Sequence, residues 1–180
     1  MKKIIFLFFA FFNLSLYSQT LPYPDGDALY SEYTSLRSAV YLKKPLVSYG
    51  YIVMKGAKNF LFKQTAPIVI EVRQKGDKLT FKKEDTQPIE IPNTQSGDNI
   101  AFLFDKDSSL DNFNVSKSFS NGKDFYLIVP KKIDKVTKIE LVSKKDKVET
   151  IKLFFKDKTL LTYEFKNTVT GTLPDEKLFQ

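Results

Sequence analysis

The sequence predicts a mixed α+β fold in which β-strands dominate. Short runs rich in Val, Ile, Phe, Tyr and Thr recur along the chain, with Gly, Asn and Asp between them. This spacing is typical of an antiparallel sheet built from hairpins. Residues 88–97 form the longest irregular connector, which is expected at one rim. The expected strands are residues 49–55, 60–64, 68–74, 78–82, 112–119, 125–129, 137–143, 150–155 and 160–165.

The late strands alternate apolar and polar residues, whereas the early strands do not. In the stretch KIELVSKK, Ile139 and Leu141 share one face and the polar residues mostly lie on the other. In the stretch NFLFK, Phe60 and Phe62 fall on one face and Leu61 on the other. Large side chains on both faces predict that both sides of that part of the sheet are covered.

Two segments are candidates for helices that cover one face of the sheet. Residues 24–44 place Leu29, Tyr33 and Leu36 at helical spacing after an aspartate N-cap, although this run could equally pass into a strand. Residues 96–113 begin with a serine or aspartate cap and continue with an apolar run. We therefore expect two helices on one face of a long, curved sheet.

Residues 1–18 have the composition of a cleaved export signal. Lys2 and Lys3 precede an apolar run over residues 4–12, which Asn13 ends too early for a membrane-spanning helix of about 20 residues. We expect cleavage after residue 18, with a retained N-terminal anchor as the alternative. Residues 19–180 are then predicted to form a single domain in the periplasm, soluble and long enough to build its own core.

The composition disfavours catalysis and metal binding. The chain has no histidine and no cysteine, which removes the usual general base, the thiol nucleophile and most zinc sites. The aspartates of residues 105–111 are spaced like the start of a calcium loop, but Leu110 occupies the place of the required glycine. We expect no enzyme activity, no cofactor and no metal. Without cysteine the protein can neither form a disulfide nor be acylated as a lipoprotein.

The net charge of +7 is modest, and Lys2 and Lys3 contribute to it. The lysines are interleaved with acidic residues along the chain, which is the pattern of a solvated surface that protects sheet edges. No motif that reads a nucleic-acid groove is present, so nucleic acid is not an expected partner. An alternative is that a weakly basic face of the protein contacts anionic lipid headgroups.

Residues 42–67, LKKPLVSYGYIVMKGAKNFLFKQTAP, carry a resemblance to a known family. They resemble the LolA family of periplasmic lipoprotein carriers, especially a branch with a Pro-Leu-x-Ser-x-Gly segment. Residues 33–35, 125–132, 138–167 and 173–179 resemble further family segments in the same order. The signature and the strand after it correspond to Pro45, Leu46, Ser48, Gly50, Phe60, Phe62 and Pro67.

The resemblance implies an unclosed antiparallel β-barrel of about eleven strands, with a helical lid over an apolar concave face. It implies a monomeric carrier that binds the acyl chains of lipoproteins and moves them from the inner to the outer membrane. An inner-membrane ABC-type transporter would load it, and an outer-membrane acceptor would unload it. The residues implied for the acyl-chain cavity are Ile52, Met54, Phe60, Phe62, Ile68, Ile70, Phe102 and Leu103.

The sequence departs from the family at two places. Gly56 and Ala57 stand where many members have an arginine and a proline that hold the lid shut, so the lid is expected to close differently. Phe62 replaces a tryptophan. Without the resemblance, the early apolar residues would be taken as ordinary core, and periodicity alone does not say which face lines a cavity. Two alternative functions are a carrier of a glycolipid or other lipid-linked product and a lipid-sensing domain that does not transport.

Overall fold

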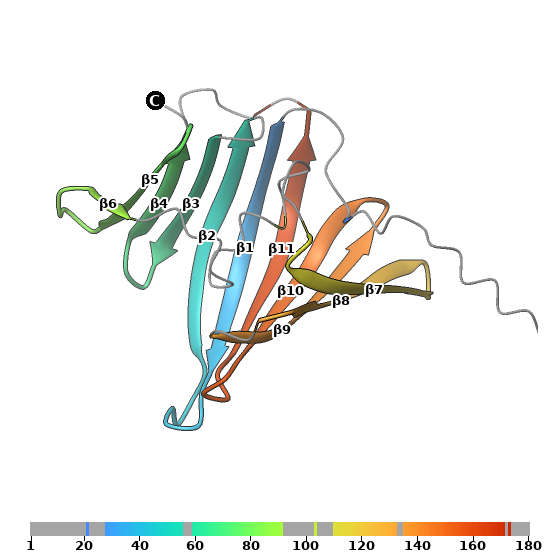
Figure 1. Ribbon diagram of the computed structural model, residues 1–180. Coiled ribbons are helices and arrows are strands. Elements are labelled where there is room, and N and C mark those ends of the chain that lie inside the picture. Colours follow the sequence, from blue (N-terminus) through green and yellow to red (C-terminus); the bar gives the residue numbers. More distant parts are fainter. Residues whose placement is uncertain are drawn as a thin grey trace, which may run out of the picture.

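The computed structural model describes residues 21, 28–55, 59–91, 103, 110–132, 135–171 and 173, and its strands form one antiparallel sheet (Figure 1). The eleven strands lie in the order β6-β5-β4-β3-β2-β1-β11-β10-β9-β8-β7. Their bounds are β1 Ala28–Ser38, β2 Leu46–Lys55, β3 Asn59–Ala66, β4 Ile70–Lys75, β5 Lys78–Lys83, β6 Ile89–Ile91, β7 Phe113–Ser120, β8 Lys123–Pro130, β9 Val136–Lys144, β10 Lys147–Phe155 and β11 Leu160–Thr170.

The sheet is bent but not closed. The first strand, β1, pairs with the last, β11, and this pair joins the two halves of the chain at the centre of the sheet. The outermost strands are β6 at one end and β7 at the other. β7 and β8 run nearly across the direction of β1 and β2 (Figure 1). An unclosed antiparallel sheet of eleven strands is therefore confirmed, and all nine strands expected from the sequence are present within a few residues.

The helix expected over residues 24–44 is wrong, because Ala28–Ser38 is strand β1. Leu29, Tyr33 and Leu36 of this strand are four and three residues apart, which is also the spacing of one helix face. The strand buries every second side chain instead, and two of these, Ser31 and Ser35, are small and polar. These serines hide the alternation that identifies a strand. The alternative that this run passes into a strand is the correct one.

The connector expected over residues 88–97 is only partly irregular, because Ile89–Ile91 forms the short edge strand β6. Its partner is β5, with Phe81 opposite Ile89 and Leu79 opposite Ile91. Three residues are too few for a strand pattern to be visible in the sequence. The second helix, expected over residues 96–113, lies mostly outside the described residues, and the export signal expected over residues 1–18 lies wholly outside them. No α-helix occurs among the residues that the structure describes.

The main core lies on one face of the sheet, which we call the inner face. It carries Ile52, Ile139, Leu141, Ile151 and Leu153, all of them fully buried or nearly so. Leu21, which precedes β1, and Leu103, which lies between β6 and β7 in the sequence, belong to the same cluster of contacting side chains, so two side chains from outside the strands cover part of this face. Burying each such side chain stabilises the fold by about 1.5–3 kcal/mol.

The opposite, outer face differs between the two halves of the sheet. In the C-terminal half it carries charged side chains such as Lys138 and Glu140, whose Nζ and Oε1 atoms are 2.7 Å apart. In the N-terminal half, Val53 and Leu61 lie opposite each other on adjacent strands, and both are buried. The expectation that strands β2 and β3 are covered on both sides is confirmed.

Candidate functional site

A row of apolar side chains crosses the inner face from the core to the edge of the sheet. Ile52 of β2 is opposite Phe62 of β3, and the row continues through Val72 of β4 and Phe81 of β5 to Ile89 of β6. Directly opposite residues of antiparallel strands point to the same face, so these five side chains form a continuous ladder. We call them the apolar ladder.

Exposure increases along the apolar ladder. Ile52 is completely buried, the three middle residues are half-buried, and Ile89 at the edge is 58% exposed. In the C-terminal half the inner face is filled instead, with Ile128, Ile139 and Leu141 at 0% exposure. The inner face therefore offers accessible apolar surface on strands β3 to β6 and a packed core on strands β8 to β10.

Four aromatic rings meet where the apolar ladder joins the core. The rings of Tyr33 and Phe62 are stacked, with their centroids 4.9 Å apart and their planes at 16°. Tyr163 meets both edge-on, at 5.4 Å from Tyr33 and 6.1 Å from Phe62. Phe165 stacks on Tyr163 at 6.2 Å. Such contacts add about 0.5–1.5 kcal/mol each to the burial of the rings, so they stabilise the inner end of the apolar ladder.

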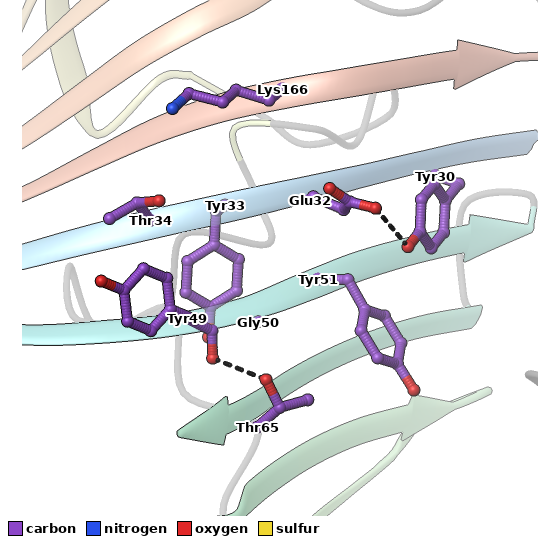
Figure 2. Close-up of a pocket in the computed structure, with 9 residues that line it drawn as sticks. All are labelled: Tyr30, Glu32, Tyr33, Thr34, Tyr49, Gly50, Tyr51, Thr65 and Lys166. Carbon is purple, nitrogen blue, oxygen red and sulfur yellow. Dashed lines mark hydrogen bonds between the residues drawn. The ribbon is translucent and has the colours of Figure 1, made fainter. Parts of the chain in front are cut away.

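Gly50 makes room for the ring of Tyr33. Residues 33 and 50 are opposite each other in the β1–β2 pair, and Tyr33 projects from β1 across β2 at Gly50 (Figure 2). A β-carbon on residue 50 would lie 2.6 Å from the Tyr33 hydroxyl oxygen and would also collide with the backbone carbonyl oxygen of Lys63. The glycine of the Pro-Leu-x-Ser-x-Gly segment is thus required by close packing.

The Tyr33 hydroxyl is buried and has no hydrogen-bond partner among the described residues. Burial raises the pKa of Tyr33 above its ordinary value of 10, and the nearby Tyr163 raises it further. Burial also raises the pKa of Tyr163. Both phenols therefore stay protonated and neutral at physiological pH, and the inner face keeps an uncharged lining at this point.

The structure brings together most of the residues that the resemblance implies for the cavity. Ile52, Met54, Phe60 and Leu103 are members of the buried core cluster, and Phe62 packs against it while remaining half-buried. Two further residues lie nearer the edge: Ile70 is half-buried at the start of β4, and Ile68 is 39% exposed in the β3–β4 connection. Phe102 lies outside the described residues. Whether these residues line an acyl-chain cavity stays a prediction.

Sequence reasoning missed the outer part of the apolar ladder, namely Val72, Phe81 and Ile89. Each is the partner of the previous residue across a strand pair, so the signal lies in the register between strands. The turns of the hairpins hold this information in principle, since a two-residue turn fixes which residues face each other. Gly76 and Asp77 form such a turn between β4 and β5.

The accessible side chains of the apolar ladder suit an apolar ligand. In the described part of the chain, no group of three or more Asp or Glu side chains is placed to hold a metal ion. A search of the same residues for a helix long and apolar enough to cross a membrane finds none. The accessible residues of the apolar ladder can bind a ligand by burying its surface.

No protein-family model matches the sequence, and no curated protein matches it significantly. Among solved structures, the chain is similar to a LolA superfamily protein from Nitrosomonas europaea, with 12% identity, 88% of this chain and 92% of that chain covered, and a TM-score of 0.49. It is also similar to a DUF1329 family protein from Desulfovibrio piger. The two share 12% identity, the match covers 87% of this chain and 92% of that chain, and the TM-score is 0.49. A third similar structure is an outer-membrane lipoprotein-sorting protein domain from Vibrio parahaemolyticus. It shares 9% identity with this chain, the match covers 86% of this chain and 89% of that chain, and the TM-score is 0.47.

Proposed function

We propose that this protein is a periplasmic carrier that binds the acyl chains of lipoproteins on its inner face and takes them from the inner to the outer membrane. The observation that supports this proposal is the apolar ladder, which runs from a completely buried residue, Ile52, to one that is 58% exposed, Ile89. Large apolar surface that is left accessible on a folded protein commonly marks a binding site. The resemblance of residues 42–67 to LolA carriers gives the class of ligand.

Burial of an acyl chain supplies enough free energy for this function without catalysis. Transfer of each CH2 group out of water contributes about 0.8 kcal/mol, so a chain of sixteen carbons gains about 12 kcal/mol when fully covered. The apolar ladder would cover such a chain only in part, because the sheet is open at β6. Incomplete cover favours release to an acceptor over permanent retention of the cargo.

Residues 1–18 would direct export and be removed, and residues 19–180 would act as one domain. An inner-membrane ABC-type transporter would load the cargo and an outer-membrane acceptor would receive it. The protein itself would act as a monomer, without a cofactor and without enzyme activity.

Displacement of a fluorescent fatty-acid probe by palmitate tests whether the apolar ladder is the binding site. Phe81→Glu places a carboxylate in the middle of the half-buried part of the apolar ladder, so we expect at least a tenfold weaker affinity for the probe. Phe125→Glu is the matched control, because Phe125 is 38% exposed on the outer face of β8. This variant should bind as the wild type does. Equal binding by both variants, or no displacement by palmitate, would overturn the proposal.

A further inference from the structure

A second concave site lies on the outer face, away from the apolar ladder. It is a pocket of about 320 Å³ over strands β1, β2, β3 and β11 (Figure 2). Tyr51 lines it and directly precedes Ile52 in β2, so the two side chains point to opposite faces of the sheet. Together with Tyr51, the side chains that define the pocket are Tyr30, Tyr49, Glu32, Thr34 and Lys166. We call this site the outer pocket.

Two β-bulges shape the outer pocket. The β1–β11 register shifts between Tyr30 and Glu32, which sets two residues of β11, Asn167 and Thr168, against the single residue Ser31 of β1. Asn167 adopts a left-handed conformation with φ of 53°, and its Nδ2 atom donates a hydrogen bond of 2.8 Å to Oε2 of Glu32. Bulges commonly re-aim side chains beside functional sites. This one fixes a carboxylate in the wall of the outer pocket.

The second bulge lies at the opposite wall. The β2–β3 register shifts between Tyr49 and Gly50, which leaves Thr65 as an extra residue of β3. The Thr65 hydroxyl donates a hydrogen bond of 3.2 Å to the carbonyl oxygen of Tyr49 (Figure 2). This contact ties the backbone of Tyr49, whose side chain is 52% exposed, to the neighbouring strand.

The tyrosines give the outer pocket flat apolar surfaces. The rings of Tyr30 and Tyr51 are stacked, with centroids 5.8 Å apart and planes at 30°. The Tyr30 hydroxyl lies 3.4 Å from Oε1 of Glu32, at the limit of a hydrogen bond. An aromatic ring presents a face that packs against C–H groups and an edge or hydroxyl that can bind polar groups. Three such rings in one pocket favour a ligand with both kinds of surface.

The charges of the outer pocket balance. Glu32 offers an acceptor and Lys166 a donor, and Lys166 makes no ion pair with any residue that the structure describes. An anionic ligand would meet the carboxylate and a cationic one the ammonium group, so neither charge is favoured. A neutral ligand that both donates and accepts hydrogen bonds can use both groups. The volume lies near the lower end of the range of about 300–1,000 Å³ for small-molecule pockets, which fits one or two sugar rings.

We propose that the outer pocket binds a saccharide, with a sugar ring packed on the tyrosine rings and its hydroxyl groups hydrogen-bonded to Glu32 and Lys166. Sugar rings combine C–H faces with hydroxyl groups that donate and accept, which matches the composition of the outer pocket. Glu32, Tyr51 and Lys166 point to the face opposite the apolar ladder. A saccharide in the outer pocket and an acyl chain on the inner face would therefore use different side chains. The outer pocket would let the protein recognise a glycan while the inner face is occupied.

Titration of the exported chain with glucose, galactose, N-acetylglucosamine, maltose and cellobiose, followed by NMR chemical shifts, tests this inference. At least one of these sugars should bind the wild type. Tyr51→Ala should weaken that binding at least tenfold, because a stacking ring is lost. Glu32→Gln should weaken it about fivefold, because a charged acceptor becomes a neutral amide. Phe125→Ala, an exposed aromatic residue elsewhere on the outer face, should bind as the wild type does.

Three results would overturn the saccharide proposal. These are no shift with any of the five sugars, shifts that Tyr51→Ala leaves unchanged in a folded protein, and tighter binding of tetramethylammonium or inorganic phosphate at the same residues. Displacement of the fatty-acid probe by palmitate in Tyr51→Ala separates this site from the inner face. We expect that displacement to be unchanged, so either proposal can fail while the other stands.

Discussion

The ring of Tyr33 lies against Gly50, with its hydroxyl oxygen 2.6 Å from the place that a β-carbon of residue 50 would occupy. This contact joins strands β1 and β2 below the outer pocket, because both residues also line that pocket. It depends on a missing side chain in one strand and a large one in the next. The two residues should therefore be energetically coupled.

Gly50→Ala should destabilise the fold by about 1–3 kcal/mol, as overpacking of a filled site does. The added methyl group meets a backbone carbonyl oxygen, that of Lys63, which cannot rotate away. Urea unfolding measures the loss. Gly76→Ala is the comparison, because residue 76 has open space around it and an added methyl group there costs only the backbone strain of its positive φ of 63°. A smaller loss for Gly50→Ala than for Gly76→Ala would contradict the packing argument.

Tyr33→Phe should leave the protein as stable as the wild type or stabilise it by up to about 1 kcal/mol near pH 7. The hydroxyl group it removes is buried without a partner among the described residues, so no hydrogen bond is lost there. A loss of more than about 1 kcal/mol in urea unfolding would show that the hydroxyl group has a stabilising partner. Tyr163→Phe provides a comparison within the same aromatic cluster.

Tyr33→Phe should also change how the free energy of unfolding depends on pH in the alkaline range. Burial raises the pKa of Tyr33 above 10 in the folded state, so above pH 10 the unfolded chain loses this proton while the folded chain keeps it. The free energy of unfolding therefore falls as the pH rises through and beyond 10. Tyr33→Phe should show a shallower fall between about pH 9 and pH 11. An unchanged slope would mean that the phenol ionises equally in both states.

Glutamate substitutions along the apolar ladder should destabilise the fold less and less toward the sheet edge. Ile52→Glu buries an unpaired carboxylate and should lower the free energy of unfolding by more than about 4 kcal/mol or prevent folding. Ile89→Glu should change it by no more than about 0.5 kcal/mol, because Ile89 is 58% exposed. Phe62→Glu should fall between them. Thermal melting of the three variants gives the order.

Leu61→Glu is the control for this series, because Leu61 is buried at 1% exposure but lies on the outer face. It should be as damaging as Ile52→Glu. If the destabilisation did not follow exposure, for example if Ile89→Glu melted as low as Ile52→Glu, the edge of the apolar ladder would be ordinary core.

The prediction that residues 1–18 are a cleaved export signal can be checked by expressing the chain in a Gram-negative host and fractionating the cells. We expect the exported chain to begin at Gln19, because the apolar run ends before it and no cysteine follows that could be acylated. N-terminal sequencing gives the answer. Intact Met1 in the membrane fraction would support a retained anchor instead.

Local patterns in the sequence predicted most of the sheet, since nine of its strands follow from runs of β-branched and aromatic residues between turn residues. The strand β1 was missed because the buried Ser31 and Ser35 break the apolar alternation and leave Leu29, Tyr33 and Leu36 at helical spacing. Local patterns could not reveal the apolar ladder, because Phe62, Val72 and Phe81 become neighbours only through the register of three strands. The outer pocket depends on two bulges, which alternation does not show.

Acyl chains bound on the inner face can be detected by mass spectrometry of the protein purified under native conditions from the periplasm, with Phe81→Glu treated in the same way. We expect the wild type to carry a bound species with lipoprotein acyl chains, and we expect Phe81→Glu to have lost it. A folded wild-type protein without any bound acyl chain would show that the inner face is not a carrier site. A bound glycolipid without a polypeptide would show that the cargo is not a lipoprotein.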